Sequence, residues 1–71
     1  MNEFQLYVKV GQEIKNIRLR KGLTQQELAD NCNFEKSNMS RIEAGRSNLT
    51  LKTLHLICNA LSVPIKDLFN E

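Results

Sequence analysis

The length of the chain, 71 residues, allows only one small hydrophobic core. A chain this short buries only about 60% of the surface of its extended form. That excludes a barrel, a nucleotide-binding βαβ fold and a DNA-binding domain joined to a separate sensor domain. The counts of glycine and proline are low, 3 and 1, and no stretch alternates Val, Ile or Thr with polar residues. We therefore expect one all-α domain over residues 1–71.

Short turn signals divide the chain into five predicted helices. Four are expected at residues 4–21, 25–32, 36–44 and 51–61, and a fifth, short one follows Val63 and Pro64. Thr24 and Glu27 have the spacing of a capping box at the start of the second helix. Further N-cap candidates are Asn2 and Thr50, and Asn33 tolerates the left-handed conformation of a sharp turn. The fourth helix is predicted to place on one face Leu51, Leu54, Ile57, Cys58 and Leu61.

The residues that could hold a metal are too few and too far apart for a site. Cys32 and Cys58 form no CxxC pair, and His55 is the one histidine, so we expect no metal and no cofactor. We favour the interpretation that both cysteines are buried or half-buried thiols in a reducing cytosol. The alternative is a disulfide between them. No apolar run reaches the ~18 residues of a membrane span, and residues 1–10 carry no basic stretch, so a cytoplasmic protein is expected.

The second and third predicted helices have the spacing of a helix-turn-helix at about residues 24–44. On the third helix, Met39 and Ile42 should point toward the core. The opposite face carries Ser37, Ser40, Arg41 and Ala44, with Lys36 at its edge. Such a slim face with donor groups suits entry into a major groove about 12 Å wide, although an ordinary solvated surface would look similar.

The positive charges are concentrated in two segments. Residues 9–21 carry five cations against Glu13, and residues 36–52 carry four against Glu43. The net charge of the whole chain is only +2. Because local charge governs contact with phosphates, the two segments favour nucleic-acid binding more than the total charge does.

Several segments together resemble the phage-repressor and Cro class of helix-turn-helix domains, the XRE family. They are Ile17–Arg18, Lys21–Ala29, Met39–Gly45, Leu51–Leu54 and Ala60–Val63, within a resemblance that covers about residues 11–69. The resemblance implies a five-helix, lambda-repressor-like domain. The segment Ser47–Leu54 also resembles the controller proteins of restriction–modification systems. Residues 1–9 precede the family's core as an N-terminal extension of the first helix, and the resemblance implies no role for them.

The resemblance implies that the protein binds double-stranded DNA as a two-fold dimer with its third helix in the major groove. Base-reading positions would be Lys36, Ser37, Asn38, Ser40 and Arg41, of which Asn38 and Ser40 could equally meet phosphate. Phosphate contacts would come from Gln25, Arg46, Ser47, Asn48 and Thr50, and Gln25 would also brace a side chain of the third helix. Arg18 and Glu43 match a structural ion pair between the first and third helices. Glu35 is a poorer N-cap than the Ser, Thr or Asp common in the family, and near DNA it would repel phosphate or accept from a cytosine amino group.

A candidate dimer surface lies in the C-terminal third of the chain. Leu56 falls off the apolar stripe of its helix, and with Ile65 and Phe69 it could form an exposed apolar patch, to which Phe4, Leu6 or Tyr7 could contribute. The alternative is that Leu56, Ile65 and Phe69 close the core of the monomer. A dimer is needed because one recognition helix reads only about three to four base pairs, too few to mark a site in a genome.

The leading functional hypothesis is a sequence-specific, autoregulatory transcriptional regulator, with RNA polymerase as a further partner if it activates. The alternative is a protein-interaction module of the same fold, such as the antitoxin of a toxin pair. An enzyme is disfavoured because the sequence offers no catalytic triad, carboxylate pair, phosphate-binding glycine loop or metal cluster.

Overall fold

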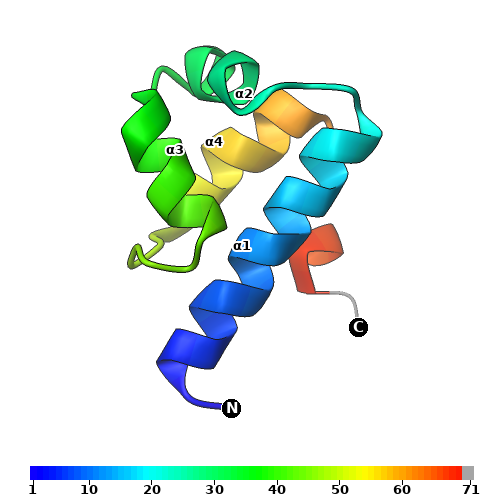
Figure 1. Ribbon diagram of the computed structural model, residues 1–71. Coiled ribbons are helices and arrows are strands. Elements are labelled where there is room, and N and C mark those ends of the chain that lie inside the picture. Colours follow the sequence, from blue (N-terminus) through cyan, green and yellow to red (C-terminus); the bar gives the residue numbers. More distant parts are fainter. Residues whose placement is uncertain (70–71) are drawn as a thin grey trace.

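The protein folds into four α-helices followed by a 3₁₀ helix, as described for residues 1–69 by a computed structural model (Figure 1). The elements are α1 (Glu3–Arg20), α2 (Gln25–Cys32), α3 (Lys36–Glu43), α4 (Leu51–Leu61) and η1 (Ile65–Phe69). The described residues contain no strand, so the all-α prediction is confirmed. The predicted helix ends differ by at most one residue for α1 and α3. The fifth predicted helix is present as a 3₁₀ helix that begins directly after Pro64.

Side-chain caps fix where three of the helices begin. The Asn2 side chain accepts from the Gln5 backbone N–H, and the Gln5 side chain accepts from Asn2 in return. Thr24 and Glu27 form the predicted capping box, with bonds of 2.8 and 3.0 Å. Thr50 caps α4 by accepting from the Thr53 backbone N–H. Each cap satisfies donors that the first turn of a helix otherwise leaves unpaired.

The capping carboxylate makes the stability of α2 depend on pH. The hydrogen bond from the Thr24 backbone holds the pKa of Glu27 below its ordinary value of 4.5. A carboxyl whose pKa is lower in the folded state stabilises the fold above its unfolded pKa, and that stabilisation is lost as pH falls through the folded pKa. We expect Glu27→Gln to lower the melting temperature at pH 7 and to have a smaller effect at pH 3. Thermal unfolding followed by circular dichroism at both pH values measures this, and an equal effect at both would contradict it.

Two left-handed residues turn the chain sharply around α2. Gly22, between α1 and α2, has φ of 72°, and Asn33, between α2 and α3, has φ of 62°. Glycine and asparagine are the residues that adopt this conformation at least cost. The short turns pack α2 against α3, and α3 against α1.

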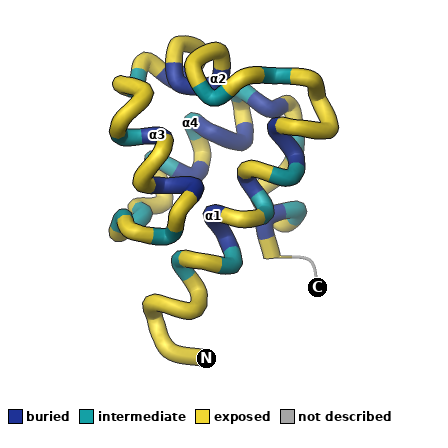
Figure 2. The backbone as a smooth tube through the Cα atoms, viewed as in Figure 1, coloured by how far each residue is buried: buried dark blue, intermediate teal, exposed yellow. Residues whose placement is uncertain are grey.

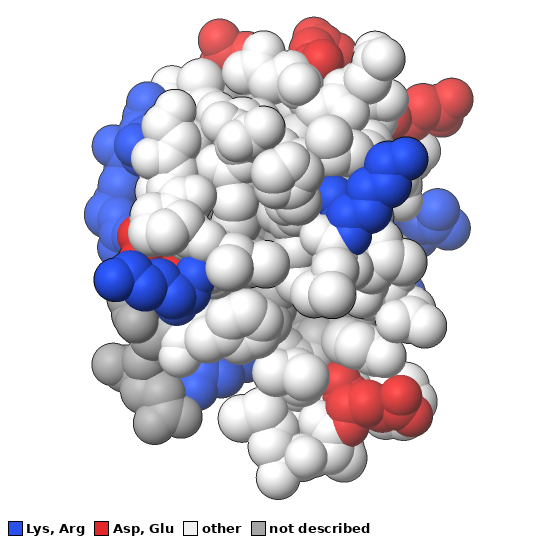
Figure 3. All heavy atoms as spheres, turned by 180° about the vertical axis from the view of Figure 1, so that it is seen from behind, with Lys and Arg blue, Asp and Glu red and all other residues white. Residues whose placement is uncertain are grey.

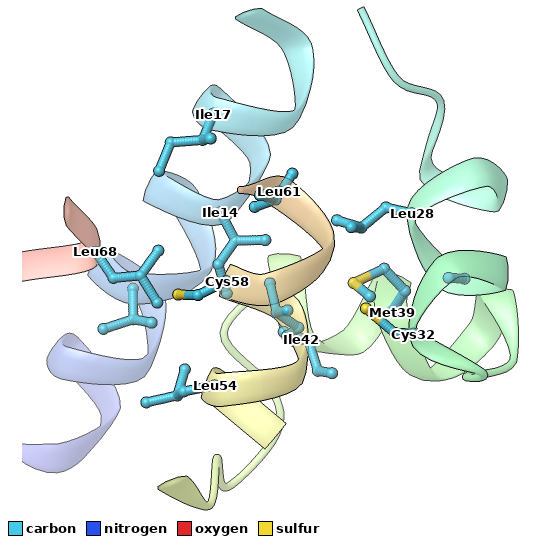
Figure 4. Close-up of a cluster of buried hydrophobic side chains, with 13 residues drawn as sticks. Ile14, Ile17, Leu28, Cys32, Met39, Ile42, Leu54, Cys58, Leu61 and Leu68 are labelled. Carbon is cyan, nitrogen blue, oxygen red and sulfur yellow. The ribbon is translucent and has the colours of Figure 1, made fainter. Parts of the chain in front are cut away.

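The core lies where α1, α2, α3 and α4 meet and is closed by η1 (Figure 4). Its fully buried side chains are Ile14, Ile17, Leu28, Met39, Ile57, Leu61 and Leu68. Cys32 and Cys58 are buried free thiols, and burial raises the pKa of both. One core prediction is wrong: Leu51 is 77% exposed, because the first turn of α4 lies beyond the edge of the core. No helix among the described residues is long and apolar enough to cross a membrane.

Candidate nucleic-acid interface

A buried ion pair holds α3 against α1. Arg18 Nε lies 2.7 Å from Glu43 Oε2, and Arg18 Nη2 lies 3.0 Å from Glu43 Oε1. The two side chains are only 8% and 3% exposed. Two parallel bonds between a guanidinium and a carboxylate fix their relative orientation as well as their distance. The two residues predicted to pair therefore meet, and the pair fixes the C-terminal end of α3.

The same pair connects to α2 through Gln25. Gln25 Nε2 donates to Glu43 Oε1 at 3.1 Å, and Arg18 Nη1 donates to the Leu23 carbonyl oxygen at 2.8 Å. Among the described residues that are not exposed, every buried side-chain nitrogen or oxygen has a hydrogen-bond partner. The network sets the position of α3 relative to both preceding helices. It also uses one N–H of the Gln25 side-chain amide, which leaves the second N–H of that amide and the backbone N–H at the start of α2 to face an anion.

The outward face of α3 carries the predicted base-reading residues. Lys36, Ser37, Ser40 and Arg41 are exposed, whereas Met39 and Ile42 are buried at 0% and 2%. At about 100° per residue, Ser37 and Arg41 fall in the middle of the exposed arc, with Ser40 and Asn38 on its two flanks. Asn38 is half-buried. A helix this slim, with donors in the middle of its free face, has the shape and chemistry that base edges require.

Two hollows border the exposed face of α3. One is lined by Gln12 and Lys15 of α1, Gln25 of α2, and Ser40 of α3. The other is lined by Asn38 of α3, Ser47 and Asn48 of the following loop, and Thr53 of α4. Because a helix in the major groove has a sugar–phosphate strand on each side, polar hollows on both flanks fit the two strands.

The loop after α3 contributes the predicted phosphate contacts of the second flank. Arg46 and Asn48 are exposed, and Ser47 is half-buried at the hollow. The Arg46 backbone N–H donates to the Arg41 carbonyl oxygen, which ties the loop to the end of α3. The Thr50 hydroxyl is engaged in the cap of α4, so a phosphate contact from it would compete with that cap.

The buried pair also leaves the surface around α3 more positive than the sequence count of charges suggests. The charge of Glu43 is compensated internally by Arg18, so it subtracts little from the surrounding surface. The exposed cations of residues 36–52 are Lys36, Arg41, Arg46 and Lys52. Glu35 is exposed at the start of α3, and its side chain makes no cap hydrogen bond. One free carboxylate therefore borders an otherwise cationic face.

The three predicted dimer residues lie away from α3. Leu56 is half-buried, and Ile65 and Phe69 are 40% and 47% exposed. None of them belongs to the buried core cluster. They come from α4 and η1, and Ile65 and Phe69 leave apolar surface exposed. Seen from behind, the molecule has a broad uncharged area between charged side chains at the edges (Figure 3).

Sequence reasoning missed the residues that seat α3 on α1. Gly11 is buried, and a Cβ built on it would collide with the Ile42 carbonyl oxygen and lie 2.8 Å from that of Glu43. Lys15 lines the hollow beside Ser40, although the sequence had shown it only as part of a basic segment. Nothing local to Gly11 signals its role, because the close approach is to a helix thirty residues further along the chain.

These features define a helix-turn-helix protein of the DNA-binding class. The sequence profile of the Helix-turn-helix family, HTH_3, matches residues 14–68, and the chain belongs to this family. Membership confirms the resemblance to the phage-repressor class.

The chain is similar to two curated bacterial and phage regulators. It is 39% identical over 62 residues to the immunity repressor protein of Bacillus phage phi105, covering 87% of this chain and 43% of that protein. It is 38% identical over 61 residues to the control protein C.BamHI of Bacillus amyloliquefaciens, covering 84% of this chain and 75% of that protein. The chain thus spans less than half the length of the phage repressor and three quarters of the control protein.

The fold is also that of a solved controller protein. The restriction–modification controller protein C.AhdI from Aeromonas hydrophila superposes with a TM-score of 0.85 at 32% identity. The match covers 89% of this chain and 96% of that one. The sequence of Ser47–Leu54 resembles that of controller proteins, and the similarity to C.AhdI extends over most of the chain.

Proposed function

We propose that the protein is a sequence-specific transcriptional regulator of the controller type, which binds a two-fold DNA operator as a homodimer with α3 in the major groove. The observation that carries the proposal is the exposed arc of α3, which offers donors at its centre and has a polar hollow on each flank. Similarity to C.BamHI and C.AhdI over most of their lengths supports the controller type.

Within this function, the residues divide into base-reading and phosphate-binding groups. Ser37 and Arg41, in the middle of the arc, face the base edges, with Lys36, Asn38 and Ser40 around them. The phosphate contacts come from Arg46, Ser47 and Asn48 on one flank and from the start of α2 at Gln25 on the other. Thr50 serves first as the cap of α4.

Two arginines should separate these roles. We expect Arg41→Ala to cost about 1–3 kcal/mol of binding free energy and to relax base preference at one position in each half-site. Arg46→Ala, its matched control in the loop, should weaken all sequences alike and reduce the slope of log Kd against log salt by about one. Fluorescence anisotropy with specific and shuffled duplexes measures both. If Arg41→Ala weakens every sequence equally, Arg41 is a phosphate contact and its assignment as a base reader is wrong.

Dimerisation supplies the second half-site and allows regulation by concentration. With two subunits, the recognition helices lie about 34 Å apart, one turn of DNA, and the site doubles in length. We assign the interface to Leu56, Ile65 and Phe69, whose exposed apolar surface lies on α4 and η1 and leaves α3 free. A regulator in the cytoplasm with this arrangement can respond to its own concentration, which suits autoregulation.

The interface assignment predicts a change of mass in solution. Leu56→Asp should convert the dimer to a monomer in sedimentation equilibrium, because a carboxylate would lose hydration in an apolar contact. Leu51→Asp places the same substitution on the same helix at a 77% exposed position and should leave the dimer intact. A dimer that persists in the Leu56 variant removes this residue from the interface.

Selection of bound DNA from random duplexes tests the proposed function. We expect enrichment of a motif with two-fold symmetry and half-sites about one helical turn apart. No enrichment would contradict sequence-specific binding and would favour the protein-interaction alternative, such as an antitoxin. A motif without symmetry would contradict the homodimer.

A further inference from the structure

The first two turns of α1 project past the body of the protein, and their residues are mostly exposed (Figures 1 and 2). They precede the matched family segment, which begins at residue 14. Two contacts nevertheless connect these turns to the loop after α3. A Cβ built on Gly45 would lie 2.6 Å from Val8 Cα, so the two backbones approach closely. Tyr7 Oη donates to Asn48 Oδ1 at 3.2 Å, across 41 positions of the sequence.

The Tyr7 bond leaves the Asn48 amide in a definite state. An asparagine side chain has one carbonyl oxygen that accepts and one NH₂ group that donates twice. With Oδ1 bonded to Tyr7, the Nδ2 group is left to donate, and within residues 1–69 it has no acceptor. Asn48 lines the hollow that flanks α3 on the loop side. In the proposed complex, donors at this place face a DNA strand.

We propose that Tyr7 is a positioning residue for DNA binding, which holds the loop and orients the Asn48 amide so that its Nδ2 group donates to a DNA phosphate. This inference rests on the proposed function and gives residues 1–9 a role in it. Tyr7 itself need not touch DNA, because its effect passes through Asn48.

The surroundings of Tyr7 suit a permanent donor. The hydroxyl has one hydrogen, for which Glu3 Oε2 at 3.4 Å competes with the nearer Asn48 Oδ1 at 3.2 Å. Partial burial and the nearby charge of Glu3 raise the pKa of Tyr7 above its ordinary value of 10.0. The hydroxyl therefore keeps its hydrogen at neutral pH. The Phe4 ring meets the Tyr7 ring edge to face, at 6.5 Å between centroids.

A double-mutant cycle of Tyr7→Phe and Asn48→Ala tests the coupling. The probes are the duplex enriched by selection and a shuffled duplex of the same length. We expect Tyr7→Phe to weaken binding to both by about 2- to 10-fold, since a phosphate contact is independent of sequence. Asn48→Ala should have a similar effect, and adding Tyr7→Phe to it should weaken binding no further. Glu3→Gln removes the other acceptor of the hydroxyl and should bind within about twofold of the original chain.

A second measurement separates positioning from a general loss of stability. The side-chain amide resonances of Asn48 should shift on DNA binding in the original chain, and this shift should shrink in Tyr7→Phe. If the original chain binds DNA and the Tyr7→Phe variant binds equally well, the inference is overturned while the proposed function stands. The same holds if Tyr7→Phe weakens binding as much in the Asn48→Ala background as it does in the original chain. If the original chain binds neither duplex, the proposed function fails as well.

Discussion

Glu43→Ala is expected to lower the free energy of unfolding by about 3–5 kcal/mol, because it leaves the Arg18 guanidinium buried without its counter-ion. The substitution also removes the acceptor of Gln25 Nε2. A small domain is stable by only about 5–15 kcal/mol, so this loss is a large share of the total. Urea denaturation followed by circular dichroism measures the change. The same variant should bind DNA more weakly, since the network holds α3 in place.

A glutamate on the same helix provides the control. Glu35 is exposed at the start of α3 and makes no cap hydrogen bond, so Glu35→Ala should change the free energy of unfolding by less than about 0.5 kcal/mol. Pairing Glu43→Leu with Arg18→Met should recover part of the stability lost in Glu43→Ala, because no charge is then left buried and unpaired. Equal effects of the two glutamate substitutions would show that the ion pair contributes nothing to stability.

Gly11→Ala is expected to destabilise the protein, although alanine is the better helix former. Helix propensity alone favours alanine by about 0.8–1.0 kcal/mol. The new Cβ, however, would press on the Ile42 and Glu43 carbonyl oxygens, which belong to the backbone of α3 and cannot rotate away. Overpacking of this kind costs about 1–3 kcal/mol, occasionally more. We expect a net loss of about 2 kcal/mol in urea denaturation, with α3 pushed away from α1.

The neighbouring position isolates the effect of the close approach. Gln12 is exposed on the same turn of α1, and Gln12→Ala should change stability by no more than about 0.5 kcal/mol. A Gly11→Ala variant as stable as the original chain would mean that α1 and α3 are not in close backbone contact. That result would remove one of the two constraints on the position of α3.

The sequence predicted the helices well because their boundaries depend on local chemistry. Thr24 and Glu27 lie three residues apart, and the side chain of each accepts from the backbone N–H of the other. The start of α2 can therefore be predicted without knowledge of the rest of the chain. Asn33 adopts the left-handed conformation for equally local reasons. The inward and outward faces of α3 followed from helical periodicity, with Met39 and Ile42 inside.

Of the long-range contacts that hold the candidate site together, the Arg18–Glu43 pair was predicted, through the family resemblance. Others could not be predicted, because they join residues far apart in the sequence. Gln25 was expected from the resemblance to contact DNA phosphate and to brace a side chain of the third helix, but the sequence did not say that this side chain is Glu43. Gly11 and Tyr7 gave no local signal, since the partner of each lies in or after α3. The exposure of Leu51 has a similar cause: periodicity places a residue on a face but does not say where along the helix the core ends.

The central claim, that the outward face of α3 binds DNA between two phosphate-binding flanks, is tested most directly by nuclear magnetic resonance. Isotope-labelled protein would be titrated with the duplex enriched by selection, and the backbone amide shifts followed residue by residue. We expect the largest shifts in Lys36–Arg41, at Gln25 and in the loop at 46–48. Shifts concentrated in η1 and the C-terminal half of α4, with α3 unchanged, would contradict it.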